Sequence, residues 1–230
     1  MKLEKVTSVE NIQQKRWYDD AYGTAMALEL VGERWSLLIV RELMFGGRRF
    51  GELKGALNGI SANVLTQRLE GMEAAGILIR RKLPPPASVQ VYELTRLGYA
   101  AETVVKELGR WAAQSPLHDP TLPLSAASIM LSFRTMLDAR AAEGINAEIG
   151  FRFGNEEFRA HLANGQIPIR RAEAAGAELI FTTTPVMLAA AVYGGAPLQD
   201  LETAGALAIE GNRTLAERFV TLFPLPPKLI

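Results

Sequence analysis

The spacing of apolar residues divides the chain into two halves. In the first half, apolar side chains recur every three or four positions, which is typical of helices that pack through one face. This spacing predicts helices over residues 24–31, 35–45, 50–57 and 61–75. In the second half a period of two becomes common, which is typical of strands. The chain is therefore predicted to be an α+β protein whose helices come first.

The helix predicted over residues 61–75 has two different faces. Ser61 is a suitable N-cap, because its hydroxyl can accept a hydrogen bond from a free backbone amide of the first turn. Gly76 can end the helix in a left-handed conformation. One face is apolar and contains Leu65, Leu69 and Met72. The opposite face is polar and contains Asn63, Thr66, Gln67 and Glu70.

A strand–loop–strand ribbon is predicted directly after this helix. Two extended runs, ILIRRK and VQVYEL, enclose the proline-containing loop PPPAS. A further helix is predicted over residues 96–113. Helices followed by a hairpin and a closing helix form the element order of a winged helix-turn-helix, a fold that can place one helix in the DNA major groove.

The second half is predicted to form a sheet packed with helices. Residues 145–153 alternate apolar and polar side chains, and Asn164-Gly165 predicts a hairpin because both residues tolerate positive φ. Further extended runs are predicted over residues 166–171, 177–183 and 205–211, with a turn over 155–157. Helices are predicted over residues 126–142, from Pro185 onward and after the capping residue Asn212.

A proline-containing stretch separates the two halves. Residues 115–125 contain three prolines, and a residue that precedes proline is biased toward extended conformations. The lengths on either side are ordinary for domains. We therefore predict a first domain over residues 1–115, a linker over 116–125 and a second domain over 126–230.

The composition argues against several kinds of chemistry. The chain of 230 residues has no cysteine, which excludes disulfides, thiolate nucleophiles and thiol redox switches. Its two histidines, His118 and His161, do not have metal-ligand spacing. The sequence contains no legible catalytic triad, phosphate-binding loop or dinucleotide motif. We therefore expect no cofactor, no metal site and no enzyme activity.

Positive charge is concentrated around the predicted polar helix and ribbon. The net charge of the chain is zero, yet residues 46–96 hold 8 Lys and Arg against 4 Asp and Glu. Such a local surplus favours a polyanionic partner. We predict that the polar helix face contacts base edges and that the flanking cations contact phosphates. The candidate DNA-binding residues are Arg48, Arg49, Ser61, Asn63, Thr66, Gln67, Arg68, Arg80, Arg81 and Lys82.

Four segments of the first half resemble the HxlR-type winged helix-turn-helix transcription regulators. They are LELVGERWSLLIVREL, GGRRFGELKGAL, GISANVLTQRLEGMEAAGIL and VYELTRLG, and the resemblance covers roughly residues 18–114. It implies a homodimer held by the first and last helices of this half, with two wings on a pseudo-palindromic operator of double-stranded DNA. It also implies that Arg48 and Arg49 lie near phosphate. Many members carry a redox-sensing cysteine at the position of Tyr22, so this chain must receive a different signal.

The second half resembles the sterol carrier protein-like lipid-binding fold over about residues 126–225. The resemblance rests on FTTTPVMLAAAVYGG and GALAIEGNRTLAERFVTLF. It implies a sheet and helices around an apolar tunnel for a small hydrophobic ligand. The candidate lining residues, which could equally form an ordinary core, are Phe151, Phe153, Met187, Leu188, Ala191, Val192 and Leu207.

These features predict a dimeric, sequence-specific transcriptional regulator, with repression as the favoured mode, whose second domain binds a small apolar effector. The alternative is a carrier of hydrophobic ligands in which the first half only forms dimers. Salt-dependent duplex binding distinguishes the two. No apolar run approaches the ~20 residues of a membrane-spanning helix, and the start lacks a secretory signal. We therefore expect a cytoplasmic location with no membrane partner.

Overall fold

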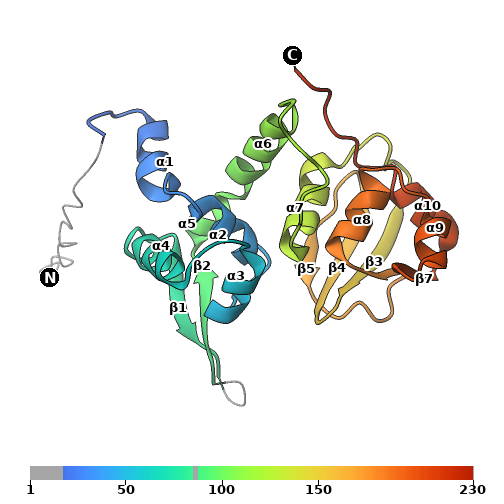
Figure 1. The fold of residues 1–230 in the computed structure, drawn as a ribbon, viewed down its shortest axis with the longest axis horizontal. Helices are drawn as coiled ribbons and strands as arrows, with labels where there is room; N and C mark the ends of the chain where they lie inside the picture. Colours follow the sequence, from blue (N-terminus) through green and yellow to red (C-terminus); the bar gives the residue numbers. More distant parts are fainter. Residues whose placement is uncertain (1–17, 85–87, 230) are drawn as a thin grey trace, which may run out of the picture.

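The computed structural model describes residues 18–84 and 88–229. Figure 1 shows the two halves in chain order, first a helical half with a long hairpin and then a half built around a larger sheet. The mixed α+β class is confirmed. Residues 1–17, which belong to the predicted first domain, lie outside the described part, as do residues 85–87 of the predicted ribbon loop.

The first half has the elements of a winged helix-turn-helix. In chain order they are α1 (Gly23–Val31), α2 (Ser36–Leu43), α3 (Phe50–Ala56), α4 (Ala62–Ala74), β1 (Leu78–Lys82), β2 (Gln90–Leu94), α5 (Arg96–Ala100) and α6 (Glu102–Ala113). Ser61 caps α4 as predicted, and its hydroxyl accepts a hydrogen bond from the amide of Val64 at 3.2 Å. Gly76 has the predicted positive φ, +69°. The two strands pair antiparallel and form the wing.

The helix predicted over residues 96–113 is two helices that meet at Ala101. The first, α5, is fixed to the wing, because Thr95 Oγ1 donates to the carbonyl of Gly76 at 2.7 Å and accepts from the amide of Gly98. Gly98 also lies so close to the backbone of Ile77 that a Cβ there would be 2.1 Å from its carbonyl oxygen. The second helix, α6, packs instead against α2 and the second half. Different packing partners therefore interrupt one helical pattern.

The second half is a five-stranded sheet with helices. Its elements are α7 (Ala126–Met136), β3 (Asn146–Phe153), β4 (Glu156–Ala163), β5 (Ile169–Arg171), β6 (Leu179–Thr183), α8 (Pro185–Val192), α9 (Leu198–Thr203), β7 (Leu207–Gly211) and α10 (Arg213–Phe219). The strand order is β5-β4-β3-β6-β7. Strands β3 and β6 run parallel, and the other neighbours run antiparallel. Asn164 and Gly165 have φ of 53° and 68°, which confirms the predicted hairpin turn.

Several predicted boundaries in this half are wrong. Helix α7 ends at Met136 and not at residue 142, because the amide of Asp138 donates to the carbonyl of Leu222 and its carboxylate accepts from the amide of Arg140. The first hairpin turns at residues 154–155, so β4 begins at residue 156, within the predicted 155–157 turn. Helix α9 was not predicted at all. These errors follow from local contacts that the residue pattern does not reveal.

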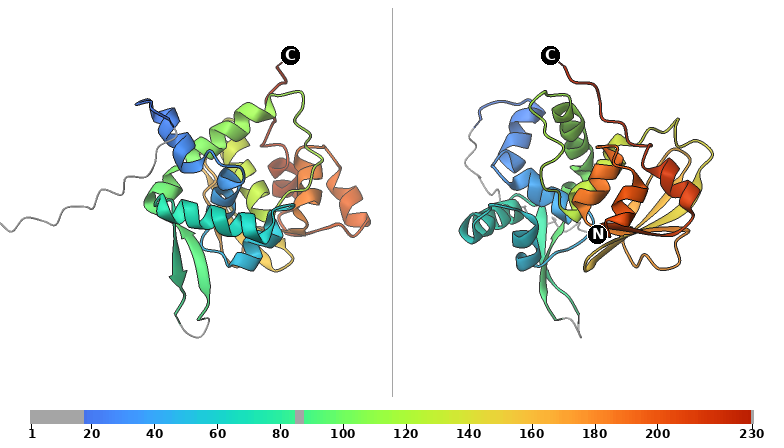
Figure 2. Two further views of the ribbon diagram at one scale, coloured as in Figure 1. Left: turned by 60° about the vertical axis from the view of Figure 1, so that its left-hand side comes forward. Right: turned by 45° about the vertical axis from the view of Figure 1, so that its right-hand side comes forward.

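Aromatic rings fill the space between the sheet and its helices. Figure 2 shows α8, α9 and α10 together on one side of this sheet. Phe133 of α7 stacks on Phe223 with ring centroids 4.4 Å apart, and Phe219 of α10 lies 5.6 Å from Phe181 of β6. Strand β3 turns Ala147, Ile149, Phe151 and Phe153 into this layer, as its period of two predicted.

The two halves share one continuous core. Residues 114–125, all of which are described, form neither helix nor strand, in agreement with a linker. On either side of it, Phe45 meets Phe158 edge to face at 5.5 Å, and the guanidinium of Arg134 lies over the Phe45 ring at 4.7 Å. Arg134 Nη1 also pairs with Glu102 of α6 at 3.0 Å. The second half is therefore packed directly on the first, whereas the exact domain boundaries stay a prediction.

Candidate nucleic-acid interface

Helix α4 exposes a row of uncharged polar side chains. Asn63, Thr66 and Gln67 are exposed in its first two turns. On the opposite face, Leu65 and Leu69 are buried in the core, where they fix the helix on its base. Ser61, whose hydroxyl caps α4, is exposed together with Ala62, so the side chains that can bond base edges lie at an exposed end of the helix.

The wing carries three cations beside α4. Arg80 pairs with Glu73 at 2.7 Å and lies 5.9 Å from the centre of the Tyr92 ring. The side chain of Arg81 is 55% exposed and pairs with Glu93 across the hairpin at 2.9 Å. Lys82 is exposed at the end of β1. Arg81 and Lys82 are thus accessible to a partner, whereas Arg80 is partly engaged with α4.

Arg68 is turned toward the protein. Its Nη2 pairs with Glu33 at 2.8 Å, and its Nε donates to the carbonyl of Arg34 at 3.1 Å. These bonds hold α4 against the turn between α1 and α2. The prediction grouped Arg68 with the DNA-contacting residues, but the structure gives its guanidinium an internal role in positioning α4.

Arg48 and Arg49 were predicted to act together at phosphate, but one is buried and the other is exposed. Arg49 is exposed at the start of α3, and its amide donates to Glu52 at 2.7 Å. Arg48 is 6% exposed and forms a backbone bridge with Tyr92. The guanidinium of Arg48 is directed into the contact between the two halves and is not free, so its expected position near phosphate stays a prediction.

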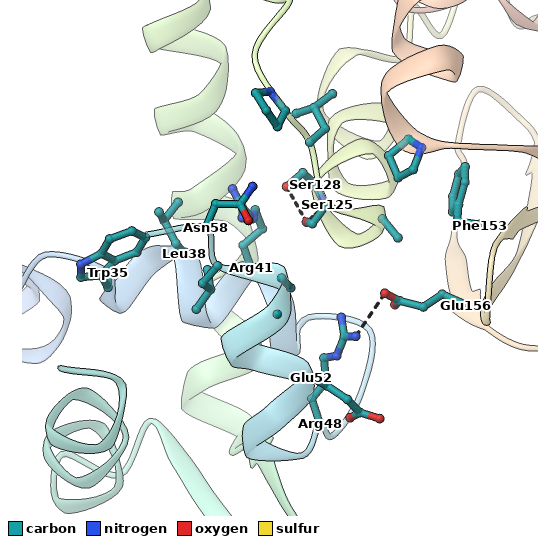
Figure 3. A pocket seen from close by; sticks show the side chains of 17 residues that line it. Trp35, Leu38, Arg41, Arg48, Glu52, Asn58, Ser125, Ser128, Phe153 and Glu156 are labelled. Carbon is teal, nitrogen blue, oxygen red and sulfur yellow. Dashed lines mark hydrogen bonds and ion pairs between the residues drawn. The ribbon is translucent and has the colours of Figure 1, made fainter. Parts of the chain in front are cut away.

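A buried ion-pair network surrounds Arg48. Its Nη1 lies 3.4 Å from Glu42, whose side chain is fully buried, and its Nη2 lies 3.1 Å from Glu156 of the β3–β4 hairpin. Glu42 also accepts bonds from Arg41 at 2.9 Å and from Ser125 at 2.6 Å. Figure 3 shows the contact between Arg48 and Glu156 across the two halves. The network joins α2 to the linker and to the sheet.

Glu156 is held in its charged form by this arrangement. Burial alone would raise the pKa of Glu156, but the hydrogen bond and charge of Arg171, followed by those of Arg48, outweigh burial and hold the pKa below its ordinary value. Sequence reasoning missed the network. The sequence does contain an indication of it, because a charged residue, Glu42, lies on the apolar face of α2 three residues after the core residue Ile39. A charged side chain at such a position needs a partner.

A cleft of about 590 Å³ opens beside the network (Figure 3). Its first wall contains Trp35 and Leu38 near the start of α2, together with Asn58 from the turn before α4. Its second wall contains Ser125 at the end of the linker and Phe153 from the other half. The cleft therefore separates the helix-turn-helix from the sheet domain at a point close to α4.

The residues predicted to line an apolar tunnel lie mostly within the packed core. Phe151 is fully buried, with ring centroids of Phe133, Phe153, Phe181 and Phe219 within 6.2 Å. Buried positions are also held by Leu188, Ala191 and Leu207, whereas Met187 and Val192 are half-buried. Phe153 alone among these seven lines the cleft of Figure 3. A tunnel through this group stays a prediction.

Exposed apolar side chains form a stripe on α6. Val104, Leu108 and Trp111 are 50%, 41% and 69% exposed, and their spacing places them on one helix face. Tyr22 and Met26, at and just after the start of α1, are also exposed, at 74% and 44%. The α6 stripe is a contiguous exposed apolar patch, which is typical of a surface that contacts another protein, and α1 adds exposed apolar residues of its own.

Among the described residues there is neither a cluster of metal-ligating side chains nor a helix that could span a membrane. No three or more His, Asp or Glu side chains within the described ranges gather as metal ligands would. Among the helices that the structure describes, none is long and apolar enough to cross a bilayer. The expected cytoplasmic location stays a prediction.

Two different family models match the two halves of the chain. Residues 30–118 match the family described as HxlR-like helix-turn-helix, and residues 122–228 match the one described as alkyl sulfatase C-terminal. The second match is not the sterol carrier protein-like family that the sequence suggested, so that resemblance stays a prediction.

Similar proteins with a stated role match the first half. The uncharacterized HTH-type transcriptional regulator YvaP of Bacillus subtilis is 35% identical over 89 residues, which are 38% of this chain and 82% of YvaP. The transcriptional regulator YodB of the same organism is 38% identical over 88 residues, which are 38% of this chain and 79% of YodB. The structure of reduced YodB covers 42% of this chain and 96% of its own, with 35% identity and a TM-score of 0.39. The chain therefore belongs to the HxlR-like helix-turn-helix family of transcriptional regulators.

Proposed function

We propose that this regulator binds double-stranded DNA as a homodimer and places α4 of each copy in the major groove of one half of a pseudo-palindromic operator. The observation that carries the proposal is the exposed row of Asn63, Thr66 and Gln67 at the start of α4. In helix-turn-helix docking this part of the second helix approaches the bases. Amide side chains such as Asn63 and Gln67 can bond adenine through two atoms at once.

Cations on both sides of α4 support the proposal. Arg49 is exposed at the start of α3, and Arg81 and Lys82 are exposed on the wing. Contacts from such side chains to phosphate fix the register of a protein on the duplex without reading its sequence. Arg48 and Arg68 are left out of this set, because their guanidinium groups bond other parts of the protein.

The second copy would pack on the apolar surface of α1 and α6. Burying Val104, Leu108 and Trp111 against their equivalents removes exposed apolar area from water, which favours association. A two-fold dimer also matches the two-fold symmetry of a pseudo-palindromic operator. Because a dimer on its operator occludes the duplex that it covers, we propose repression as the mode, exerted by binding and not by catalysis.

The second half would hold a small apolar effector, as its resemblance to the sterol carrier protein-like fold implies. Its direct packing on the first half offers a route from ligand to DNA. A ligand changes DNA binding only if it prefers one arrangement of the two halves. The carrier alternative requires no DNA binding, so a chain that shows no salt-dependent binding to duplex would favour it.

Gln67→Ala is expected to reduce discrimination between operators. A good base contact contributes ~1–3 kcal/mol of discrimination, and Asn63→Ala should behave in the same way. An operator would first be selected from random duplexes with the natural chain, and fluorescence anisotropy would then compare it with single-base variants. Gln199→Ala, an exposed amide on α9, is the matched control and should change nothing. If Gln67→Ala discriminated between operators as well as the natural chain does, Gln67 would not contact the bases.

Arg81→Ala is expected to weaken binding to every duplex by a similar factor. Loss of one phosphate contact should lower the slope of log affinity against log salt by about 1. The measurement is a titration of one duplex at several salt concentrations. Arg170→Ala removes an exposed arginine from β5 and serves as the control. An unchanged slope and affinity for Arg81→Ala would place the wing away from the phosphates.

A further inference from the structure

A second pocket, of about 290 Å³, lies beneath the linker between the two halves. The inward face of α6 forms one wall, with Val105 and Gly109. The linker crosses above it with Leu122 and Leu124. Helix α7, Tyr193 and the C-terminal segment form the wall from the other half. Any molecule held there would touch both halves and the linker at the same time.

The C-terminal segment bounds this pocket by returning to α6. Lys228 Nζ donates to the carbonyls of Ala113 and Ser115 at 3.0 Å, and the amide of Leu229 donates to Gln114 at 2.8 Å. These bonds bring Leu225 into the pocket wall. The pocket therefore has walls from both halves and is open to solvent beside the linker, where Leu122 is exposed.

The lining is apolar except at defined points. Its larger side chains are Val105, Leu122, Leu124, Leu131, Met136 and Leu225. Within this lining, the hydroxyls of Tyr193 and Ser132 form a hydrogen bond with each other. Burial raises the pKa of Tyr193 to about 12, partly offset by that bond, so the phenol stays neutral. Arg41 also reaches the pocket, but it is already paired with Glu42.

These features define the chemistry of a ligand. An apolar cavity of ~150 Å³ in another protein holds one benzene molecule, so a pocket about twice that size has room for one or two rings. The neutral Tyr193–Ser132 pair can bond one hydroxyl or carbonyl group. An anion is disfavoured, because the guanidinium of Arg41 in this lining is bonded to Glu42 and Asp119 adds a carboxylate to it.

The larger cleft of Figure 3 is a poorer site for such a molecule. Arg41, Arg48, Glu52 and Glu156 all contribute to its lining. An apolar ligand there would have to separate charged groups from water without replacing their hydration, which is unfavourable. The smaller pocket has fewer charged groups in its lining: the guanidinium of Arg41 is paired with Glu42, and the carboxylate of Asp119 is exposed and accepts hydrogen bonds from Thr121.

We propose that the pocket beneath the linker is the effector site of this regulator and takes a molecule of one or two rings, mainly apolar, with one hydroxyl or carbonyl group. The regulatory part rests on the proposed function. Helix α6 provides the connection, since Val105 and Gly109 face the pocket whereas Val104, Leu108 and Trp111 form the stripe proposed to hold the dimer. A ligand that displaces α6 would change the separation of the two α4 helices.

Gly109 offers a direct way to fill the pocket. A Cβ at Gly109 would meet nothing within 4 Å, and leucine is a better helix former than glycine. Gly109→Leu should therefore fold and occupy the pocket. Gly55→Leu is a matched control, because Gly55 is also helical, has the same free space and lines the larger cleft.

The test uses 2-naphthol, a fluorescent two-ring molecule with one hydroxyl, and the full chain. The natural chain and Gly55→Leu should bind it saturably at one molecule per chain, and Gly109→Leu should bind at least about tenfold more weakly because its side chain fills the site. Tyr193→Phe should weaken 2-naphthol but leave naphthalene unchanged. The site would be overturned if 2-naphthol did not bind the natural chain, or if it bound Gly109→Leu as tightly as the natural chain. It would also be overturned if Gly55→Leu, and not Gly109→Leu, lost affinity for 2-naphthol.

A second arm separates the site from its regulatory role. Saturating 2-naphthol should change the affinity of the natural chain for its selected duplex by about fivefold or more, a typical coupling between two sites, and should not change that of Gly109→Leu. An unchanged affinity in the natural chain would overturn the effector role. Duplex binding without 2-naphthol tests the proposed function by itself, and 2-naphthol binding without duplex tests the pocket by itself.

Discussion

Glu42→Ala is expected to lower the free energy of unfolding by about 3 kcal/mol, the lower end of the range for breaking a buried ion pair. The substitution leaves Arg48 buried with Glu156 as its remaining carboxylate and removes the acceptor of Ser125. The partial exposure of Glu156 keeps the effect from being larger. For a chain of this length, thermal unfolding should shift downward by about 6–12 °C.

The control for Glu42→Ala is Glu217→Ala, which breaks the exposed pair of Glu217 with Arg213 on α10. Exposed pairs contribute ~0–1 kcal/mol, so the transition should barely move. Denaturant unfolding followed by circular dichroism measures both variants. Equal stability of the two variants would contradict the view that the network around Arg48 holds the two halves together.

Leu108→Glu is expected to separate the dimer and to reduce operator affinity by about 10²–10⁴, because two linked contacts become one. Leu108 lies at the centre of the α6 stripe and is 41% exposed, so the charge should disturb the association and leave the monomer folded. Light scattering after size-exclusion chromatography gives the mass of the particle, and anisotropy gives the affinity for the selected operator.

The matched control is Thr103→Glu, which adds the same charge to α6 at an exposed position away from the stripe. It should remain dimeric and bind the operator as the natural chain does. If Leu108→Glu stays dimeric at the same concentrations, the two copies meet through another surface.

Local chemistry explains why α4 could be predicted. A capping hydroxyl at Ser61, a left-handed stop at Gly76 and an apolar face through Leu65 and Leu69 are all set within a few residues. The same applies to the Asn164-Gly165 turn. Such features need no information about distant parts of the chain, so the residue pattern was sufficient for them.

Contacts between distant segments explain what could not be predicted. Arg48 and Arg49 are adjacent and chemically identical, yet Arg48 is buried because Glu156, far along the chain, approaches it. Arg68 is engaged for the same reason, since Glu33 comes from the turn before α2. The parallel pairing of β3 with β6 also depends on tertiary arrangement. A charge count identifies cations, but the fold decides which of them stay free for DNA.

The absence of cysteine permits a direct test of where α4 lies on DNA. Ala62→Cys, at the exposed start of α4, would carry a tethered iron–EDTA group that cuts nearby DNA strands. The dimer described here predicts two clusters of cuts on the selected operator, about 10 base pairs apart and symmetric about its centre. The same group on Gln199→Cys should give no such clusters. The placement of α4 in the major groove would be contradicted if the duplex were bound but the group at position 62 gave no localised cuts. Cuts that matched those from position 199 would contradict it as well.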